Sequence, residues 1–271
     1  MLFRSGMLAL TAAFLSHSPG AFILAAFLLG CGVFVFVFVA GRSLYGVASP
    51  SPAILGVKFA LTGLSVTVLL GLLLVLGLNG VFSLPVVELA NVHLGWGLMA
   101  WGCVLLAAVG YVVVPMFQMT PGYPVPFGRH FPLLVLAFLG AWSVSDWLWP
   151  ESVGTGILGT MIIALAGSFA LLTLSLQRRS KRAKYDTTQR YWQVAMFSTL
   201  AACVLWLLVR VAPPLADWRG WPLLCGVLLL WGGFMSVIIG MLYKIVPFLV
   251  WMHLQHQGLG RVIAPNMKKV L

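Results

Sequence analysis

The chain has 271 residues, of which 61% are hydrophobic and only 8% are charged, and its mean hydropathy is +1.05. Soluble domains carry about 25% charged residues, so this composition excludes an ordinary soluble protein. The apolar runs are long enough to cross a bilayer as helices and do not alternate with period two, which excludes a transmembrane β-barrel. We therefore predict one all-α integral membrane domain over residues 1–271.

The apolar runs predict seven transmembrane helices. Ahead of them, Leu8–Leu15 is an apolar segment too short to span a membrane, and no small-residue cleavage site of a signal peptide follows it. We expect that segment to lie at the membrane interface. The predicted spans cover residues 20–42, 55–79, 88–117, 130–149, 154–177, 191–212 and 221–251.

Charge predicts the orientation. The linker 178–190, with the sequence RRSKRAKYDTTQR, holds six Lys and Arg residues, so the positive-inside rule places it in the cytoplasm. Alternating the spans from this linker gives a periplasmic N-terminus and a cytoplasmic C-terminus in a bacterial inner membrane. Of the sixteen Lys and Arg residues, all but Arg4, Arg210 and Arg219 then lie inside. The net charge of +11 thus indicates loops facing anionic lipid, and no nucleic-acid partner is expected.

Tryptophans near the predicted span ends are typical of the aromatic belt at the lipid headgroups. Among them are Trp147, Trp192 and Trp251. The four cysteines lie within predicted spans without C-x-x-C spacing, which indicates small apolar packing residues. They are Cys31, Cys103, Cys203 and Cys225.

The third span begins with a histidine and ends in a proline motif. His93 precedes Pro115 by 22 residues, which is about 33 Å of helix and therefore about one hydrocarbon thickness. An imidazole just inside one membrane surface is a candidate axial ligand for a haem between helices. The alternative is a histidine at a helix end that bonds to a backbone carbonyl or to Glu88.

This third span resembles helix II of the haem–copper oxidase subunit I family, which includes cytochrome oxidases and nitric oxide reductases. It is also similar to NnrS-like membrane haem proteins. The matching residues are His93, Gly110, Tyr111, Val114, Pro115, Met116 and Phe117. The resemblance implies a distant, reduced relative with an oxidase-like arc of helices, in which His93 ligates the iron of a b-type haem.

Other residues of the third span complete the candidate haem site. Trp96, Trp101 and Gly102 lie deeper in the span, where they either allow close helix packing or line the macrocycle. A low-spin haem needs a second axial ligand. His17 is a candidate if the N-terminal segment folds back, and a Met, a Cys or another subunit are alternatives.

Copper is a disfavoured second metal. Met116, Met119 and His130 could supply ligands, as could the pair His253 and His256. Methionine in membrane helices usually serves packing, and a histidine pair at a helix end is typical of the lipid interface.

The resemblance does not extend to a catalytic centre. The oxidases place metal-binding histidines on a later helix, whereas residues 223–250 contain none, so the chain is not expected to be an autonomous oxidase. We expect a subunit for electron transfer or for haem and NO handling, with partner subunits or a cytochrome c-type donor. The alternatives are a cofactor-free structural or assembly subunit and a small-solute permease.

A short motif occurs twice in the chain, because Tyr111–Pro115 and Tyr243–Pro247 both read Y-x-x-V-P. The offset, meaning the difference in residue number, is 243 − 111 = 132, and the same offset places Cys225 at the position of His93. This indicates either a parallel repeat of four-helix units or a common way to end a helix at the interface, because proline cannot continue the hydrogen-bond ladder. We expect both prolines to terminate their helices.

Overall fold

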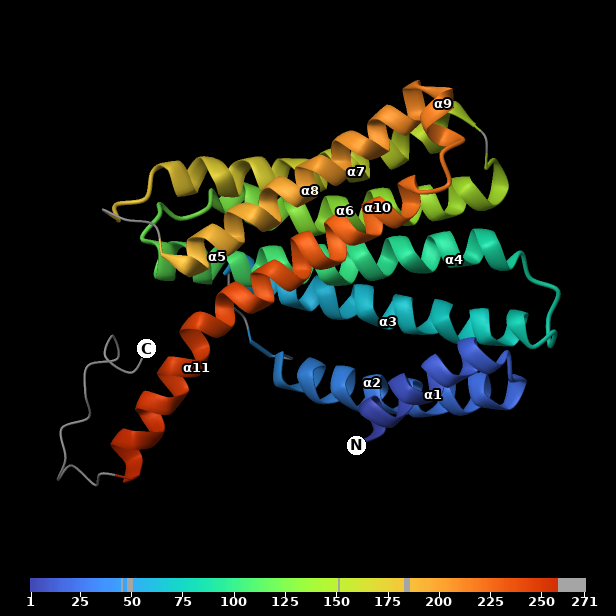
Figure 1. Ribbon diagram of the computed structural model, residues 1–271, viewed down its shortest axis with the longest axis horizontal. Coiled ribbons are helices and arrows are strands. Elements are labelled where there is room, and N and C mark those ends of the chain that lie inside the picture. Colours follow the sequence, from blue (N-terminus) through green and yellow to red (C-terminus); the bar gives the residue numbers. More distant parts are fainter. Residues whose placement is uncertain (45, 48–50, 151, 183–185, 258–271) are drawn as a thin grey trace. The chain divides into compact units, whose positions relative to one another are not determined.

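The computed structural model describes residues 1–44, 46–47, 51–150, 152–182 and 186–257. Within these residues every regular element is a helix, and seven helices are long and apolar enough to cross a membrane (Figure 1). The chain is therefore a multi-pass membrane protein in contact with the lipid bilayer. The spans are Pro19–Leu44, Pro52–Leu78, Val86–Gln118, Val125–Leu148, Val153–Arg178, Thr187–Val211 and Trp221–Gln255.

The described residues form two compact units. Unit 1 comprises residues 1–112 and 123–165, and unit 2 comprises residues 113–122 and those from 166 on. Each unit is held together by a helix pair in which a long helix packs on the one that follows it along the chain.

Unit 1 begins with a helical hairpin, formed by α1 (Leu2–Ser16) and α2 (Pro19–Leu44). The two helices lie side by side in opposite directions (Figure 1). Gly6 meets the side chain of Leu29, and Gly32 meets the backbone of Phe3, so glycine allows close approach at both contacts. The N-terminal segment therefore forms a helix that folds back along α2. The prediction that it lies at the membrane interface is wrong, because a short apolar run does not show which helix will pack against it.

The rest of unit 1 is arranged around α3 (Pro52–Leu78). This helix packs on α2, on α6 (Val125–Leu148) and on the third span. The third span has three parts in one continuous helix, listed here in order: α4 (Val86–Gly95), the π-helix η1 (Trp96–Cys103) and α5 (Val104–Gln118). The core of the unit includes Ala100, Leu139 and Ile162, all buried.

Unit 2 contains a similar helix pair. Here α8 (Thr187–Val211), which follows α7 (Val153–Arg178), packs on the seventh span. The short helix α9 (Pro213–Ala216) connects α8 to that span. The span again has an α-helix, a π-helix and an α-helix in sequence: α10 (Trp221–Val227), η2 (Leu228–Met235) and α11 (Ser236–Gln257).

The two repeated prolines lie inside helices. Pro115 is followed by three more residues of α5, whereas α11 continues for ten residues beyond Pro247. The expectation that both prolines terminate their helices is therefore wrong for Pro247. Membrane helices tolerate proline because neighbouring groups and small local adjustments satisfy the backbone carbonyl that loses its donor.

Candidate functional site

The imidazole of His93 is bound to the neighbouring helix. Its Nδ1 lies 3.0 Å from the carbonyl oxygen of Thr67 in α3. Because a carbonyl can only accept, Nδ1 carries the proton in the neutral ring and Nε2 carries the lone pair. Of the two structural partners considered for His93, a carbonyl and Glu88, the carbonyl is the one observed. This bond leaves Nε2 as the nitrogen that could bind a metal.

Gly71 makes room for the imidazole. It lies one turn after Thr67, and a Cβ at this position would be 3.1 Å from Cε1 and 3.6 Å from Nδ1 of His93. The hydroxyl of Thr67 is engaged within α3, where it donates to the carbonyl of Gly63 at 2.8 Å. The ring of His93 thus rests against the backbone of α3, and it is half-buried.

The two tryptophans of the third span contact other helices. Trp96 Nε1 donates to Ser143 Oγ of α6 at 3.0 Å. Trp101 meets Phe36 of α2 edge to face, with ring centroids 6.5 Å apart. Gly102 lies in η1 and is half-buried. The structure therefore places His93, Trp96 and Trp101 against three different helices.

The candidate second ligand lies in a turn. His17 follows α1 with a left-handed φ of 50°, and its side chain is exposed. Among the described residues no three or more His, Cys, Asp or Glu side chains gather as a metal site. His17 is therefore not part of such a group within the described residues.

The predicted copper ligands Met116, Met119 and His130 are all exposed. Met116 and Met119 are exposed at 57% and 50%. His130 is exposed, and its Nδ1 lies 2.8 Å from the carbonyl of Pro126, one turn earlier in the same helix. The side chain of His256 lies outside the described residues, so the pair with His253 stays a prediction.

Sequence reasoning missed a charged network in unit 2, at the start of α8. Asp186 Oδ2 lies 2.7 Å from Lys244 Nζ of α11 and 2.5 Å from Arg182 Nη1. Asp186 Oδ1 accepts the backbone N–H of Gln189 at 2.9 Å, which makes Asp186 the N-cap of α8. An Asp followed three residues later by a Gln resembles a capping box and could have revealed this cap.

Unit 2 also buries polar side chains near the same end of α8. Gln177 Nε2 donates to Gln118 Oε1 at 2.9 Å, and both residues are buried. Gln189 and Trp192 are fully buried, and their side-chain nitrogen and oxygen atoms have no hydrogen-bond partner. Trp192 is therefore not part of a lipid-facing belt, contrary to the sequence prediction. Span-end position alone cannot tell a lipid-facing tryptophan from one covered by another helix.

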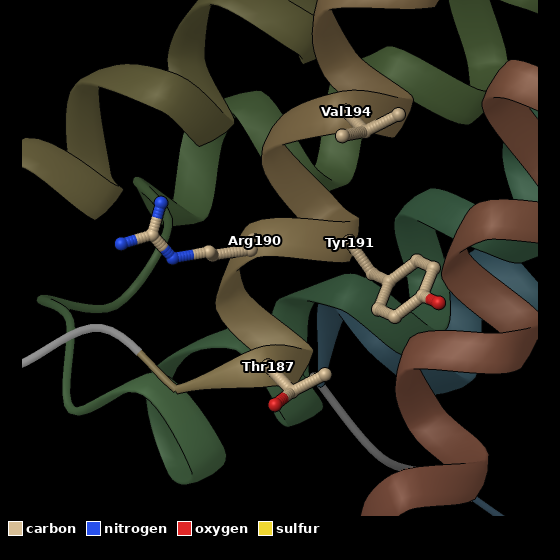
Figure 2. A pocket seen from close by; sticks show the side chains of 4 residues that line it. All are labelled: Thr187, Arg190, Tyr191 and Val194. Atoms are coloured by element: carbon tan, nitrogen blue, oxygen red, sulfur yellow. The ribbon is translucent and has the colours of Figure 1, made fainter.

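A surface hollow of about 320 Å³ lies on α8. Thr187, Arg190, Tyr191 and Val194 line it, and the side chains of Arg190 and Tyr191 point in opposite directions (Figure 2). Tyr191 is stacked on Tyr243 of α11, with ring centroids 5.8 Å apart. The hollow is an open depression of the surface.

Comparisons with protein-family models, with curated proteins and with solved structures found no match to this chain. The candidate site therefore rests on its own geometry.

The charged network predicts a loss of stability in acid. Burial raises the pKa of Asp186, but the hydrogen bonds from Lys244 and the Gln189 amide and the charges of Lys244 and Arg182 outweigh it and leave that pKa below its usual value. A lowered pKa means that the ionised group stabilises the folded state above its usual pKa, and that this contribution disappears as pH falls through the lowered value.

We expect Asp186→Asn to lower the thermal midpoint of the purified protein at neutral pH. Between about pH 5 and 2 the midpoint of the unsubstituted protein should fall more steeply than that of the variant. Asp217→Asn, at an exposed position, is the control. Parallel pH profiles for the unsubstituted protein and Asp186→Asn would contradict the role of the network.

Proposed function

We propose that this chain is a membrane b-type haem protein that binds iron through His93. It resembles part of haem–copper oxidase subunit I and acts in electron transfer, or in haem and NO handling, as a subunit of a larger complex. Bound haem would supply one-electron redox chemistry. Partner subunits or a cytochrome c-type donor would exchange electrons with it.

The observation that carries this proposal is the hydrogen bond from His93 Nδ1 to the Thr67 carbonyl, at 3.0 Å. Histidines that bind metals almost always donate their other ring N–H to a carbonyl or carboxylate, because that bond sets the tautomer and the ring orientation and raises the basicity of the ligating nitrogen. The bond therefore leaves Nε2 as the nitrogen that would bind haem iron. A purely structural histidine would make the same bond, and the spectrum of the purified protein distinguishes the two.

The surroundings of His93 support a defined ring position. Thr67 orients the imidazole, and Gly71 leaves the space that the ring needs. Trp96 and Trp101 contribute by holding the third span against α6 and α2. No histidine occurs in residues 223–250, so the proposal does not include a binuclear oxygen-reducing centre.

A small-solute permease is the second candidate, and one observation favours it. The third and seventh spans both contain an eight-residue π-helix, η1 in Trp96–Cys103 and η2 in Leu228–Met235. π-helical segments within α-helices are frequent at functional sites, and these two lie at corresponding positions of their spans. A cofactor-free structural or assembly subunit is a further alternative.

We propose the orientation that the positive-inside rule predicts, with a periplasmic N-terminus and a cytoplasmic C-terminus in a bacterial inner membrane. The support is the charge of residues 178–190.

Visible spectroscopy tests the haem proposal. The full-length protein, purified in detergent, should show a Soret band and, when reduced, sharp α and β bands. His93→Ala should lower the haem content by about tenfold or more, while His130→Ala should leave it unchanged because that ring bonds within its own helix and is exposed. Thermal midpoints of both variants check folding. A stable but colourless unsubstituted protein would contradict haem binding.

Osmotic measurements on proteoliposomes test the permease. If the second candidate is right, vesicles that contain the protein should admit urea or glycerol faster than empty vesicles. If vesicles with and without the protein admit both solutes at equal rates, the permease candidate is contradicted.

Cysteine labelling tests the orientation. The starting variant has all four native cysteines replaced by serine. Single cysteines are then introduced by Ser83→Cys, between α3 and α4, or by Thr187→Cys, at the start of α8. Both positions are exposed. An impermeant maleimide should label position 83 in intact bacterial spheroplasts and position 187 only after permeabilisation. The reverse pattern would invert the proposed topology.

A further inference from the structure

The two π-helices occupy equivalent positions in the chain. The offset in residue number from η1 to η2 is 132 at their first residues and again 132 at their last. This is also the offset between the two Y-x-x-V-P motifs, which lie further along the same two spans. Since π-helices are rare and usually arise as local interruptions of α-helices, two of equal length at one offset indicate that the third and seventh spans share an origin.

The contacts of these spans repeat as well. In unit 1, a Cβ on Gly63 would lie 2.5 Å from the carbonyl carbon of Ala100. In unit 2, a Cβ on Gly232 would lie 2.6 Å from Cβ of Ser198. The offset from Gly63 to Ser198 is 135, and the offset from their partner Ala100 to Gly232 is 132. The same crossing therefore occurs in both units. The glycine lies on α3 in unit 1 and on the seventh span in unit 2.

A second crossing obeys the same two offsets. A Cβ on Gly56 would lie 2.7 Å from Cβ of Ala108, and a Cβ on Gly240 would lie 2.6 Å from Cβ of Tyr191. The offset from Gly56 to Tyr191 is again 135, and the offset from Ala108 to Gly240 is again 132. One residue of each pair is again a glycine. It lies on α3 in unit 1 and on the seventh span in unit 2.

The third repeated contact is the candidate site itself. His93 Nδ1 lies 3.0 Å from the carbonyl of Thr67, and Cys225 Sγ lies 4.0 Å from the carbonyl of Ala202. The offset from Thr67 to Ala202 is 135, and the offset from His93 to Cys225 is 132. The change from 135 to 132 means that three fewer residues separate the two partners in unit 2, and connections between helices tolerate such changes.

The helix boundaries extend the match beyond these two spans. The ends of α1 and α6 have an offset of 132, whereas their starts have an offset of 123 because α6 is nine residues longer. Both the starts and the ends of α2 and α7 have an offset of 134. For α3 and α8 the offset is 135 at the starts and 133 at the ends. Four successive helices thus recur in order with nearly constant spacing.

We infer that the chain is a tandem duplication of a four-helix repeat, whose first copy runs from α1 to α5 and whose second runs from α6 to α11. Cys225 occupies in the second copy the position that His93 occupies in the first. The two copies differ both at this position and at the position of Gly71. Gly71, which makes room for the imidazole, corresponds to Trp206 at the offset of 135. The first copy therefore combines a ring with a glycine and the second combines a small thiol with an indole. Gly71 is thus a positioning residue for His93. Of the two equivalent positions, 93 and 225, only position 93 carries an imidazole.

The inference goes beyond the proposed function and holds whether or not iron is bound, so its test uses the stability of the full-length protein. Gly56→Ala should lower the thermal midpoint by about 3–10 °C, because the new Cβ would lie 2.7 Å from Cβ of Ala108. Adding Ala108→Gly removes that Cβ and moves the glycine to the third span, as in the second copy, and should restore most of the loss. Gly140→Ser, with nothing within 4 Å of its Cβ, is the control.

The reciprocal exchange provides the second arm. Gly232→Ala should destabilise the protein, and adding Ser198→Gly should restore it, because this copies the pair of the first unit into the second. Recovery in both units supports the duplication. A double variant in either unit that loses as much as the sum of its single substitutions would overturn it. Where a single variant does not accumulate, recovery of folded protein in the double variant is the readout.

The same exchange at the candidate site tests the role of Gly71. Gly71→Trp should lower the midpoint, and adding His93→Cys should restore most of it, because the pair then matches Trp206 and Cys225. An additive loss would overturn the equivalence of the two positions. This readout is independent of colour, so a colourless protein would contradict haem binding and leave the duplication standing.

Discussion

The structure of both units depends on the close crossing of two helix backbones. Within a bilayer, helices gain little from burying apolar surface against each other, so their association relies on close packing of small residues. Gly63 in unit 1 and Gly232 in unit 2 meet this need from opposite helices. At each crossing one of the two residues therefore lacks a side chain, because the space between the helices admits one Cβ and not two.

This crossing sets the register of every other contact in the helix pair. Once α3 and the third span meet at Gly63, the next turns bring Gly71 and the Thr67 carbonyl to the imidazole of His93. The position of the imidazole is thus a consequence of the packing. In unit 2 the same register brings Cys225 to a carbonyl. The helix crossings recur in both halves, and the side chains at and around the position of His93 and Cys225 distinguish them.

Polar groups appear where the helix pairs leave the apolar layer. Asp186 caps α8 and pairs with Lys244 of α11, so one carboxylate joins the start of one helix to a later part of another. A half-buried lysine benefits from such a partner, because an unpaired charge away from water is costly. The buried amides of Gln118 and Gln177 satisfy each other in part, in the same way.

The sequence by itself determined the membrane class and the seven spans, because a helix that crosses a bilayer must present a long apolar run. It also revealed the Y-x-x-V-P repeat and singled out His93. Only the tertiary structure decided that α1 folds back along α2, that α11 continues past Pro247, and that Trp192 is buried. It also decided that Trp96 and Trp101 face different helices. These features depend on which helix lies opposite each residue, and a span that is apolar on all sides carries little periodic signal of its neighbours.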